Sequence, residues 1–274
     1  MKLHPILRPA GIAVLAALGL SLAGCSSTKP KPYVEHPVDQ LYNSALDTLN
    51  SGQYQKAAKD FDDVEREHPY SVWATKAELM AAFAYYEGNK YDDAILAAQR
   101  YTQLHPGDKD VAYAYYLIAI CYYEQITDVQ RDQKITAQAL AALREVVRRF
   151  PDTAYARDAR LKIDLARDHL AGKEMSVGRY YLDRGDYTAA INRFRVVVVR
   201  YQTTTQVPEA LERLTECYLA LGIVDEARTA AAVLGANYPA STWYRHAYTL
   251  LTGRNLTPKA DKGSWISRAF TSVF

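Results

Sequence analysis

Apolar side chains recur at helical spacing over most of the chain. Counting from Tyr54, offsets of three, seven and ten residues select Ala57, Phe61 and Val64. The same offsets select apolar residues in two later segments: Ala139, Leu143 and Val146, and then Ala190, Phe194 and Val197. Side chains three, four and seven residues apart lie on one face of an α-helix. The pattern therefore predicts an amphipathic helix, with one buried face, in each of these segments.

Each of these predicted helices is followed by a regularly placed stop signal. In four segments a proline stands 15 residues after the first position: 54 and Pro69, 91 and Pro106, 136 and Pro151, 224 and Pro239. In a fifth segment, which starts at Tyr187, Gln202 takes the place of the proline. Proline has no N–H to donate and disfavours helix in the residue before it. Each helix is therefore expected to end just before this position.

A second apolar helix is predicted upstream of most of these segments. In four of them a small residue precedes a tyrosine by three positions: Ala82 and Tyr85, Ala119 and Tyr122, Gly178 and Tyr181, Thr215 and Tyr218. The small residue allows a neighbouring helix to approach closely, and the tyrosine fills the groove one turn later. The chain is thus predicted to be a series of helix pairs.

The order of small residue, tyrosine, glycine, aromatic residue, alanine and terminal proline resembles the tetratricopeptide repeat (TPR), whose unit is about 34 residues long. The resemblance implies an all-α fold, a right-handed superhelical array of about five TPR hairpins with a capping helix over residues 38–252. The anchoring alanines at 57, 94, 139, 190 and 227 are 37, 45, 51 and 37 residues apart. We expect the surplus of the second interval in a polar excursion near residues 126–134, and that of the third in one long or kinked helix between 153 and 176.

The first residues are typical of a targeting signal rather than of a folded domain. Residues 1–24 combine a basic start with a short apolar run, as a secretory signal peptide does. The run ends in Leu22-Ala-Gly-Cys25, which resembles the lipobox of bacterial lipoproteins. The resemblance implies that Cys25 becomes the mature N-terminus and carries a covalent diacylglycerol and an N-acyl chain, such as palmitate. A conventional signal with a chance cysteine is the alternative.

The residues after Cys25 indicate where the mature protein resides. Ser26 rather than Asp follows the cysteine, which by the lipoprotein sorting rule implies a periplasm-facing lipoprotein of the Gram-negative outer membrane. Residues 25–37 contain three prolines and are expected to form a flexible, extended spacer. At the other end, residues 253–274 form a tail in which positions 266, 269, 270 and 273 are apolar. This spacing predicts a short amphipathic helix that folds back or docks on a partner, with a frayed end as the alternative.

Composition and charge narrow the function classes. The chain has 33 Lys and Arg residues and 31 Asp and Glu residues, which gives a formal net charge of +2. This small net charge does not favour binding to nucleic acid. The 22 tyrosines favour half-buried packing and recognition surfaces. Besides Cys25, the chain has Cys121 and Cys217, which we interpret as buried free thiols; a bridge between them is the minor alternative.

A search for catalytic chemistry finds no candidate site. The sequence contains no Gly-x-Ser-x-Gly elbow, Walker-type loop, His-Glu-x-x-His or Cys-x-x-Cys motif. We therefore expect no catalytic residue, no metal and no cofactor other than the acyl groups at Cys25, and we expect that the protein is not an enzyme.

Lipidation, a proline-containing spacer and five TPR-like units together resemble the BamD family, lipoprotein subunits of the outer-membrane protein assembly (BAM) complex. The most specific stretch is Tyr180-Tyr-Leu-Asp-Arg-Gly-Asp-Tyr-Thr-Ala-Ala-Ile-Asn-Arg193. The resemblance implies a non-enzymatic scaffold that binds the POTRA domains of a BamA-type barrel insertase, contacts other BAM subunits and presents unfolded outer-membrane proteins for insertion into the membrane.

Candidate contacts follow from this resemblance and from local charge. By position, Asn192 and Arg193 match the segment of the family that faces BamA, and Arg195 belongs to a helix with few acidic neighbours. A plain solvated face is the alternative for these residues. A groove for substrate peptides is predicted along the first three repeats, at tyrosines that are also candidates for packing between repeats: Tyr85, Tyr86, Tyr115, Tyr116 and Tyr123.

A second function remains open at this point. A periplasmic TPR lipoprotein that scaffolds a cell-wall or division complex has the same periodicity, because one repeat scaffold serves many partners.

Overall fold

The computed structural model describes residues 36–271, and this part of the chain is all-α, as predicted. The described residues from Pro37 onward belong to one compact unit. The predicted signal peptide, Cys25 and nearly all of the spacer lie outside the described residues, as do the last three residues of the tail.

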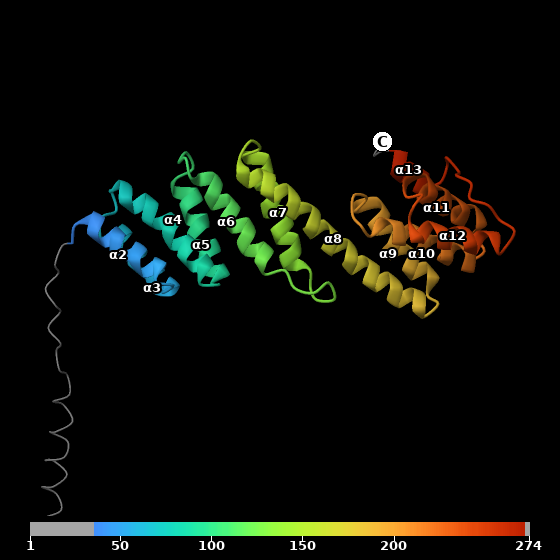
Figure 1. Cartoon of the computed structure of the whole chain (residues 1–274), viewed down its shortest axis with the longest axis horizontal. Helices are drawn as coiled ribbons and strands as arrows, with labels where there is room; N and C mark the ends of the chain where they lie inside the picture. The colour runs from blue at the N-terminus through green and yellow to red at the C-terminus, as the bar shows by residue number, and fades with distance from the viewer. Residues whose placement is uncertain (1–35, 272–274) are drawn as a thin grey trace, which may run out of the picture. The chain divides into compact units, whose positions relative to one another are not determined.

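Ten helices form five consecutive pairs in the described region, and each helix packs against the next one in the chain (Figure 1). The pairs are α2 (Val38–Asn50) with α3 (Tyr54–Glu67), α4 (Val72–Glu87) with α5 (Tyr91–Leu104), α6 (Val111–Glu124) with α7 (Lys134–Arg149), α8 (Ala154–Asp183) with α9 (Tyr187–Arg200), and α10 (Val207–Ala220) with α11 (Val224–Asn237). Two further helices follow, α12 (Thr242–Thr252) and α13 (Trp265–Thr271).

The second helix of each pair begins and ends where the repeated marks predict. Four of these helices start at the first repeat position, at residues 54, 91, 187 and 224, and α7 starts two residues before Thr136. All five end two residues before the predicted stop position, and the residue between is an aromatic or a histidine: His68, His105, Phe150, Tyr201 and Tyr238. The anchoring alanines of the five helices are fully buried.

The glycine or asparagine before these helices has a backbone role. Gly52, Gly185 and Gly222 have φ angles of 76°, 77° and 73°, and Asn89 has 55°. Glycine adopts this left-handed conformation without steric cost, and asparagine tolerates it better than most residues. The residue therefore ends the first helix of the pair and turns the chain into the second.

Helix α8 joins two apolar cores. Its first part packs on α6 and α7 through Ala159, and its last part packs on α9 through Ala171 and Met175. Between these parts, Leu161 and Leu165 are 67% and 59% exposed. The surplus residues of the fourth repeat thus form one continuous 30-residue helix. Those of the third repeat form the loop between Glu124 and Lys134.

The tail folds back onto the last repeats. α12 packs on α10 and α11, and α13 lies against α11 and α9. Ile266 is fully buried in the same core as Phe194 and Leu234. The amide of Gln202 donates to the carbonyl of Ala269 at 2.7 Å.

Cys121 and Cys217 are free and buried, each in a different apolar cluster. Burial raises the pKa of both thiols to about 12. The interpretation as buried free thiols therefore agrees with the structure. None of the described helices is both long and apolar enough to cross a bilayer.

Candidate functional site

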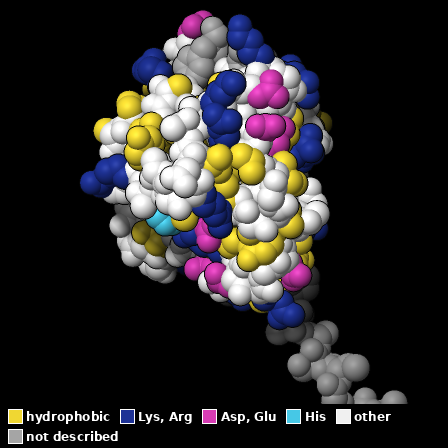
Figure 2. Space-filling view, turned by 90° about the vertical axis from the view of Figure 1, so that its right-hand side faces the viewer, with side chains coloured by type: hydrophobic (Ala, Val, Ile, Leu, Met, Phe, Trp, Pro, Cys, Tyr) yellow, Lys and Arg dark blue, Asp and Glu magenta, His cyan; other side chains and the backbone are white. Residues whose placement is uncertain are grey.

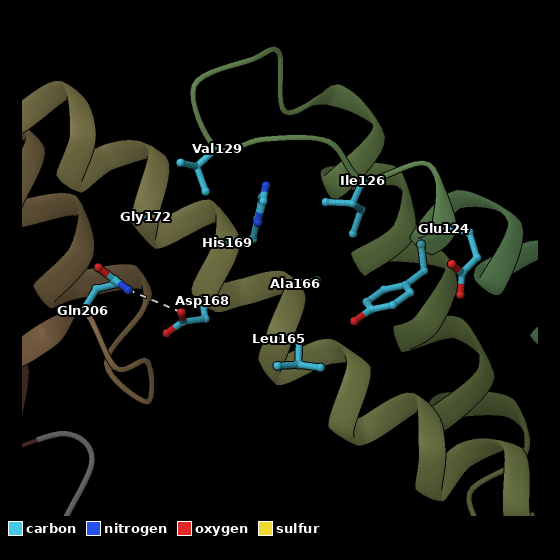
Figure 3. A pocket seen from close by; sticks show the side chains of 10 residues that line it. Glu124, Ile126, Val129, Leu165, Ala166, Asp168, His169, Gly172 and Gln206 are labelled. Atoms are coloured by element: carbon cyan, nitrogen blue, oxygen red, sulfur yellow. Dashed lines mark hydrogen bonds between the residues drawn. The ribbon is translucent and has the colours of Figure 1, made fainter.

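A cavity of about 540 Å³ lies where the third repeat meets the fourth (Figure 3). Its walls come from the end of α6, the loop that follows, the middle of α8 and the residue before α10. The lining residues are Tyr123, Glu124, Ile126, Val129, Leu165, Ala166, Asp168, His169, Gly172 and Gln206. The cavity exists because the long α8 separates the two cores and the loop after α6 covers the gap.

Polar contacts hold two walls of this cavity in place. The Asp168 carboxylate accepts hydrogen bonds from the backbone N–H of Thr205 at 2.8 Å and from the amide of Gln206 at 3.3 Å. On the other side, Lys173 Nζ donates to the carbonyl of Gln130 at 2.6 Å. α8 is thereby tied both to the start of α10 and to the loop after α6.

The interior of the cavity offers apolar surface and one unsatisfied polar atom. His169 points from α8 toward the loop that carries Val129, and its buried Nε2 has no hydrogen-bond partner among the described residues (Figure 3). Tyr123 also lines the cavity, and Lys162 Nζ lies 5.5 Å from the centroid of its ring. Such a site can hold an apolar side chain of a peptide and one polar group.

The five predicted groove tyrosines are half-buried and pack in neighbouring clusters. Tyr85 and Tyr86 pack at the interfaces of the first three repeats, whereas Tyr115, Tyr116 and Tyr123 pack on the core of the third repeat and α8. The hydroxyls of Tyr85 and Tyr116 donate to Asp62 at 3.4 Å and to Asp158 at 2.6 Å.

Two other tyrosines of the predicted groove, Tyr86 and Tyr115, contact neighbouring aromatic rings. The Tyr115 ring lies 5.5 Å from Phe150, and the Tyr86 ring lies 6.1 Å from Tyr91. Burial raises the pKa of Tyr85, Tyr86 and Tyr116. Packing between repeats accounts for these contacts, and of the five tyrosines it is Tyr123 that lines the large cavity.

Helix α9 presents the predicted partner-binding residues, all exposed but in different surroundings. Arg193 faces α8, where its Nη1 lies 3.2 Å from Glu174 Oε2. Arg195 faces the tail, where its guanidinium lies over the Trp265 ring, 4.9 Å from the centroid. Asn192 borders a cleft shared with Tyr187 and Leu221.

Comparison with known proteins identifies the family. Residues 34–234 match the family described as "Outer membrane lipoprotein". A protein of Caulobacter vibrioides named outer membrane protein assembly factor BamD is 50% identical, over 93% of this chain and 84% of that protein. One of the same name from Rickettsia prowazekii is 44% identical, over 88% of this chain and 96% of that protein.

The chain belongs to the BamD family.

The family assignment confirms the resemblance inferred from the repeats, and it favours outer-membrane assembly over the cell-wall alternative. A solved structure, the TPR2AB-domain:pHSP90-complex of yeast Sti1, has a TM-score of 0.42 and 12% identity, covering 79% of this chain and 84% of that one. The assignment to BamD rests on the bacterial relatives and not on this loose likeness.

Among residues 36–271, no group of three or more His, Cys, Asp or Glu side chains could hold a metal ion. BamD family membership and a repeat fold both favour a protein that binds other polypeptides.

Two residues of the cavity and of the α9 surroundings could not be recognised from the sequence. Leu165 lies in the long helix α8, and the apolar periodicity of this helix does not indicate which of its leucines remain exposed. Trp265 was assigned to a tail that either folds back or docks elsewhere, and the sequence has no local signal that pairs it with Arg195, 70 residues earlier. A solitary tryptophan in an amphipathic segment was the one available hint.

Proposed function

We propose that this protein is a non-enzymatic lipoprotein scaffold of the outer-membrane β-barrel assembly machinery. Acyl chains at Cys25 hold it on the periplasmic face of the outer membrane. The α9 side binds the POTRA domains of a BamA-type insertase, and the earlier repeats receive unfolded barrel proteins. The observation that carries the proposal is the 50% identity to a BamD protein over 93% of this chain.

The proposed mechanism is an increase of effective concentration. Two binding surfaces on one anchored scaffold turn the encounter of substrate and insertase into an event within one complex. Repeat arrays suit this task because neighbouring units present separate surfaces at fixed spacing. No bond is made or broken by the scaffold itself.

Reversal of charge at Arg193 tests the insertase contact. Arg193→Glu is expected to weaken binding to the POTRA domains about thirtyfold or more, because breaking a hydrogen-bonded charge pair buried in an interface costs about 2–5 kcal/mol. Binding is measured by co-purification from detergent-solubilised membranes and by titration of the purified proteins.

The matched control is Arg66→Glu, which changes a 67%-exposed arginine in the first repeat and should leave insertase binding unchanged. Equal binding by the Arg193→Glu protein and the wild type would exclude this residue from the interface. Co-purification of a penicillin-binding protein in place of the insertase would contradict the proposed function itself.

For the substrate, we place binding at the cavity beside Tyr123, because this is where one of the predicted tyrosines borders open space. Leu165→Asp is expected to weaken binding of an extended, aromatic-ended peptide from the C-terminus of a barrel substrate about tenfold. Burial of a leucine side chain contributes about 1.5–3 kcal/mol, and a carboxylate in its place would have to be desolvated. Binding is measured by fluorescence polarisation of the labelled peptide.

Leu161→Asp is the matched control for this measurement. Leu161 is 67% exposed on the same helix, one turn earlier, and it does not line the cavity. It should leave both peptide binding and thermal unfolding unchanged. If the two aspartate variants lose the same affinity, the effect comes from the general charge of α8 and the cavity is not the peptide site.

A further inference from the structure

The tail and α9 share an excess of positive charge. α9 contains three arginines and no acidic residue. Residues 253–271 carry four cations, Arg254, Lys259, Lys262 and Arg268, against the single acid Asp261. Because α13 packs against α9, these two segments form one surface, which we call the α9–tail surface. Figure 2 shows this end of the molecule, where several Lys and Arg side chains lie in the upper part with Asp and Glu side chains among them.

Trp265 is held firmly at the centre of this surface. Its indole Nε1 donates to the hydroxyl of Tyr218 at 3.0 Å, and Tyr218 is itself 6% exposed in the core of the last repeats. The neighbouring Ser264 hydroxyl donates to Glu226 Oε2 at 2.6 Å, and Ile266 is fully buried. The position of the indole is therefore determined by the folded repeats.

The Trp265 ring in turn positions Arg195. A guanidinium over an aromatic face is attracted by the ring and loses side-chain freedom. Its N–H donors point outward in the guanidinium plane, so they remain available to an acceptor beside it. The arginine is thus oriented before any partner arrives, which lowers the entropy cost of binding.

Arg195 differs from its neighbour Arg193 in its charge partner. Arg193 already lies beside the Glu174 carboxylate. In the described part of the chain, no carboxylate lies within ion-pairing distance of Arg195. A fixed, exposed guanidinium without an internal carboxylate is a ready site for a carboxylate of another molecule.

We propose that Arg195, positioned by Trp265 of the tail, binds a carboxylate on an acidic protein surface, so that the tail is part of the docking surface for the insertase. This inference rests on the proposed function for the identity of the partner. The occupant is a protein and not a lipid bilayer, because the apolar side chains Ile266 and Phe270 of α13 are buried in the repeats and cannot insert into a membrane.

The test uses the full-length lipoprotein and the insertase of the same organism, both in detergent, with binding measured by titration. Arg195→Ala is expected to weaken binding about tenfold, and Arg195→Lys should recover only part of this loss. Trp265→Leu should weaken binding three- to tenfold, whereas Trp265→Phe, which keeps an aromatic face, should weaken it less.

Trp265 is a positioning residue, and this role predicts non-additive effects. The double variant Arg195→Ala/Trp265→Leu should bind no more weakly than Arg195→Ala alone. The loss caused by Arg195→Ala should also shrink as salt is raised, because the wild-type contact is electrostatic. A merely structural tail would instead give multiplied losses that do not depend on salt, and that result would overturn the inference.

The outcomes separate this inference from the proposed function. If the wild-type protein does not bind the insertase, the proposed function fails. If the wild type binds and the Arg195→Ala protein binds equally well, the function stands and the inference fails. Arg195-dependent flotation of the Cys25→Ala protein with phosphatidylglycerol vesicles would assign the surface to anionic lipid and also overturn it. Arg195 is exposed, so unchanged thermal unfolding of Arg195→Ala verifies that the variant is folded.

Discussion

Cys25→Ala is expected to release this protein from the membrane into the soluble periplasmic fraction. In the proposed function the acyl chains at Cys25 attach the protein to the membrane, and removing them should abolish that attachment. Each buried CH₂ contributes about 0.8 kcal/mol, and a single chain gives only marginal binding, whereas two or three hold a protein stably. Removing the cysteine removes all of these chains together.

The measurement is membrane fractionation after a carbonate wash, which strips proteins held only by partner proteins, combined with intact-mass analysis of the acyl groups. Cys121→Ala and Cys217→Ala are the matched controls, because both thiols are buried in the repeats. Each control protein should stay in the membrane fraction. A washed membrane that retains the Cys25→Ala protein would show that the lipobox assignment is wrong.

Gly178→Ala is expected to destabilise the last repeats strongly, although alanine favours helix more than glycine does. Gly178 lies inside α8, and a Cβ there would lie 2.8 Å from Cδ1 and Cζ of Phe194. Phe194 is fully buried in the core of the last repeats, so moving its ring would disturb the packing around it. Overpacking of this kind costs about 1–3 kcal/mol, which exceeds the gain of about 1 kcal/mol in helix propensity.

The same helix supplies the control for this prediction. At Gly172 a Cβ would lie 3.4 Å from Val129 Cγ1, an ordinary contact, so Gly172→Ala should leave the melting temperature unchanged or raise it. Phe194→Leu combined with Gly178→Ala should recover part of the lost stability, because the shorter side chain leaves room for the methyl group. Thermal unfolding followed by circular dichroism measures all three. An unchanged melting temperature for Gly178→Ala would mean that α8 and α9 are packed less closely than described.

Local signals explain why the repeats could be predicted from the sequence. A left-handed residue at Gly52 or Asn89 and a helix-ending residue 15 positions after Tyr54 or Tyr91 act on their own neighbours in the chain. The alanine between them is small because a second helix must approach there. The same requirements recur in every repeat, and a pattern that occurs five times rarely arises by chance.

The candidate binding residues were harder to predict because exposure and partners depend on distant segments. The sequence marked Arg193 and Arg195 as a pair of similar arginines, yet one lies beside Glu174 and the other over Trp265. It predicted a groove at five tyrosines, but not the hydrogen bonds that the hydroxyls of Tyr85 and Tyr116 donate to Asp62 and Asp158.

The sequence by itself determined that this chain is an array of helix pairs of the BamD type, because capping, turn and helix-period signals are encoded within each unit of the chain. Only the tertiary structure decided which residues are available to partners. The cavity beside Tyr123 arises from the length of α8 relative to its neighbours, and the setting of Arg195 arises from a tail that packs on it from 70 residues away. Such contacts depend on the packing of whole elements against one another, and no local pattern of residues reports them.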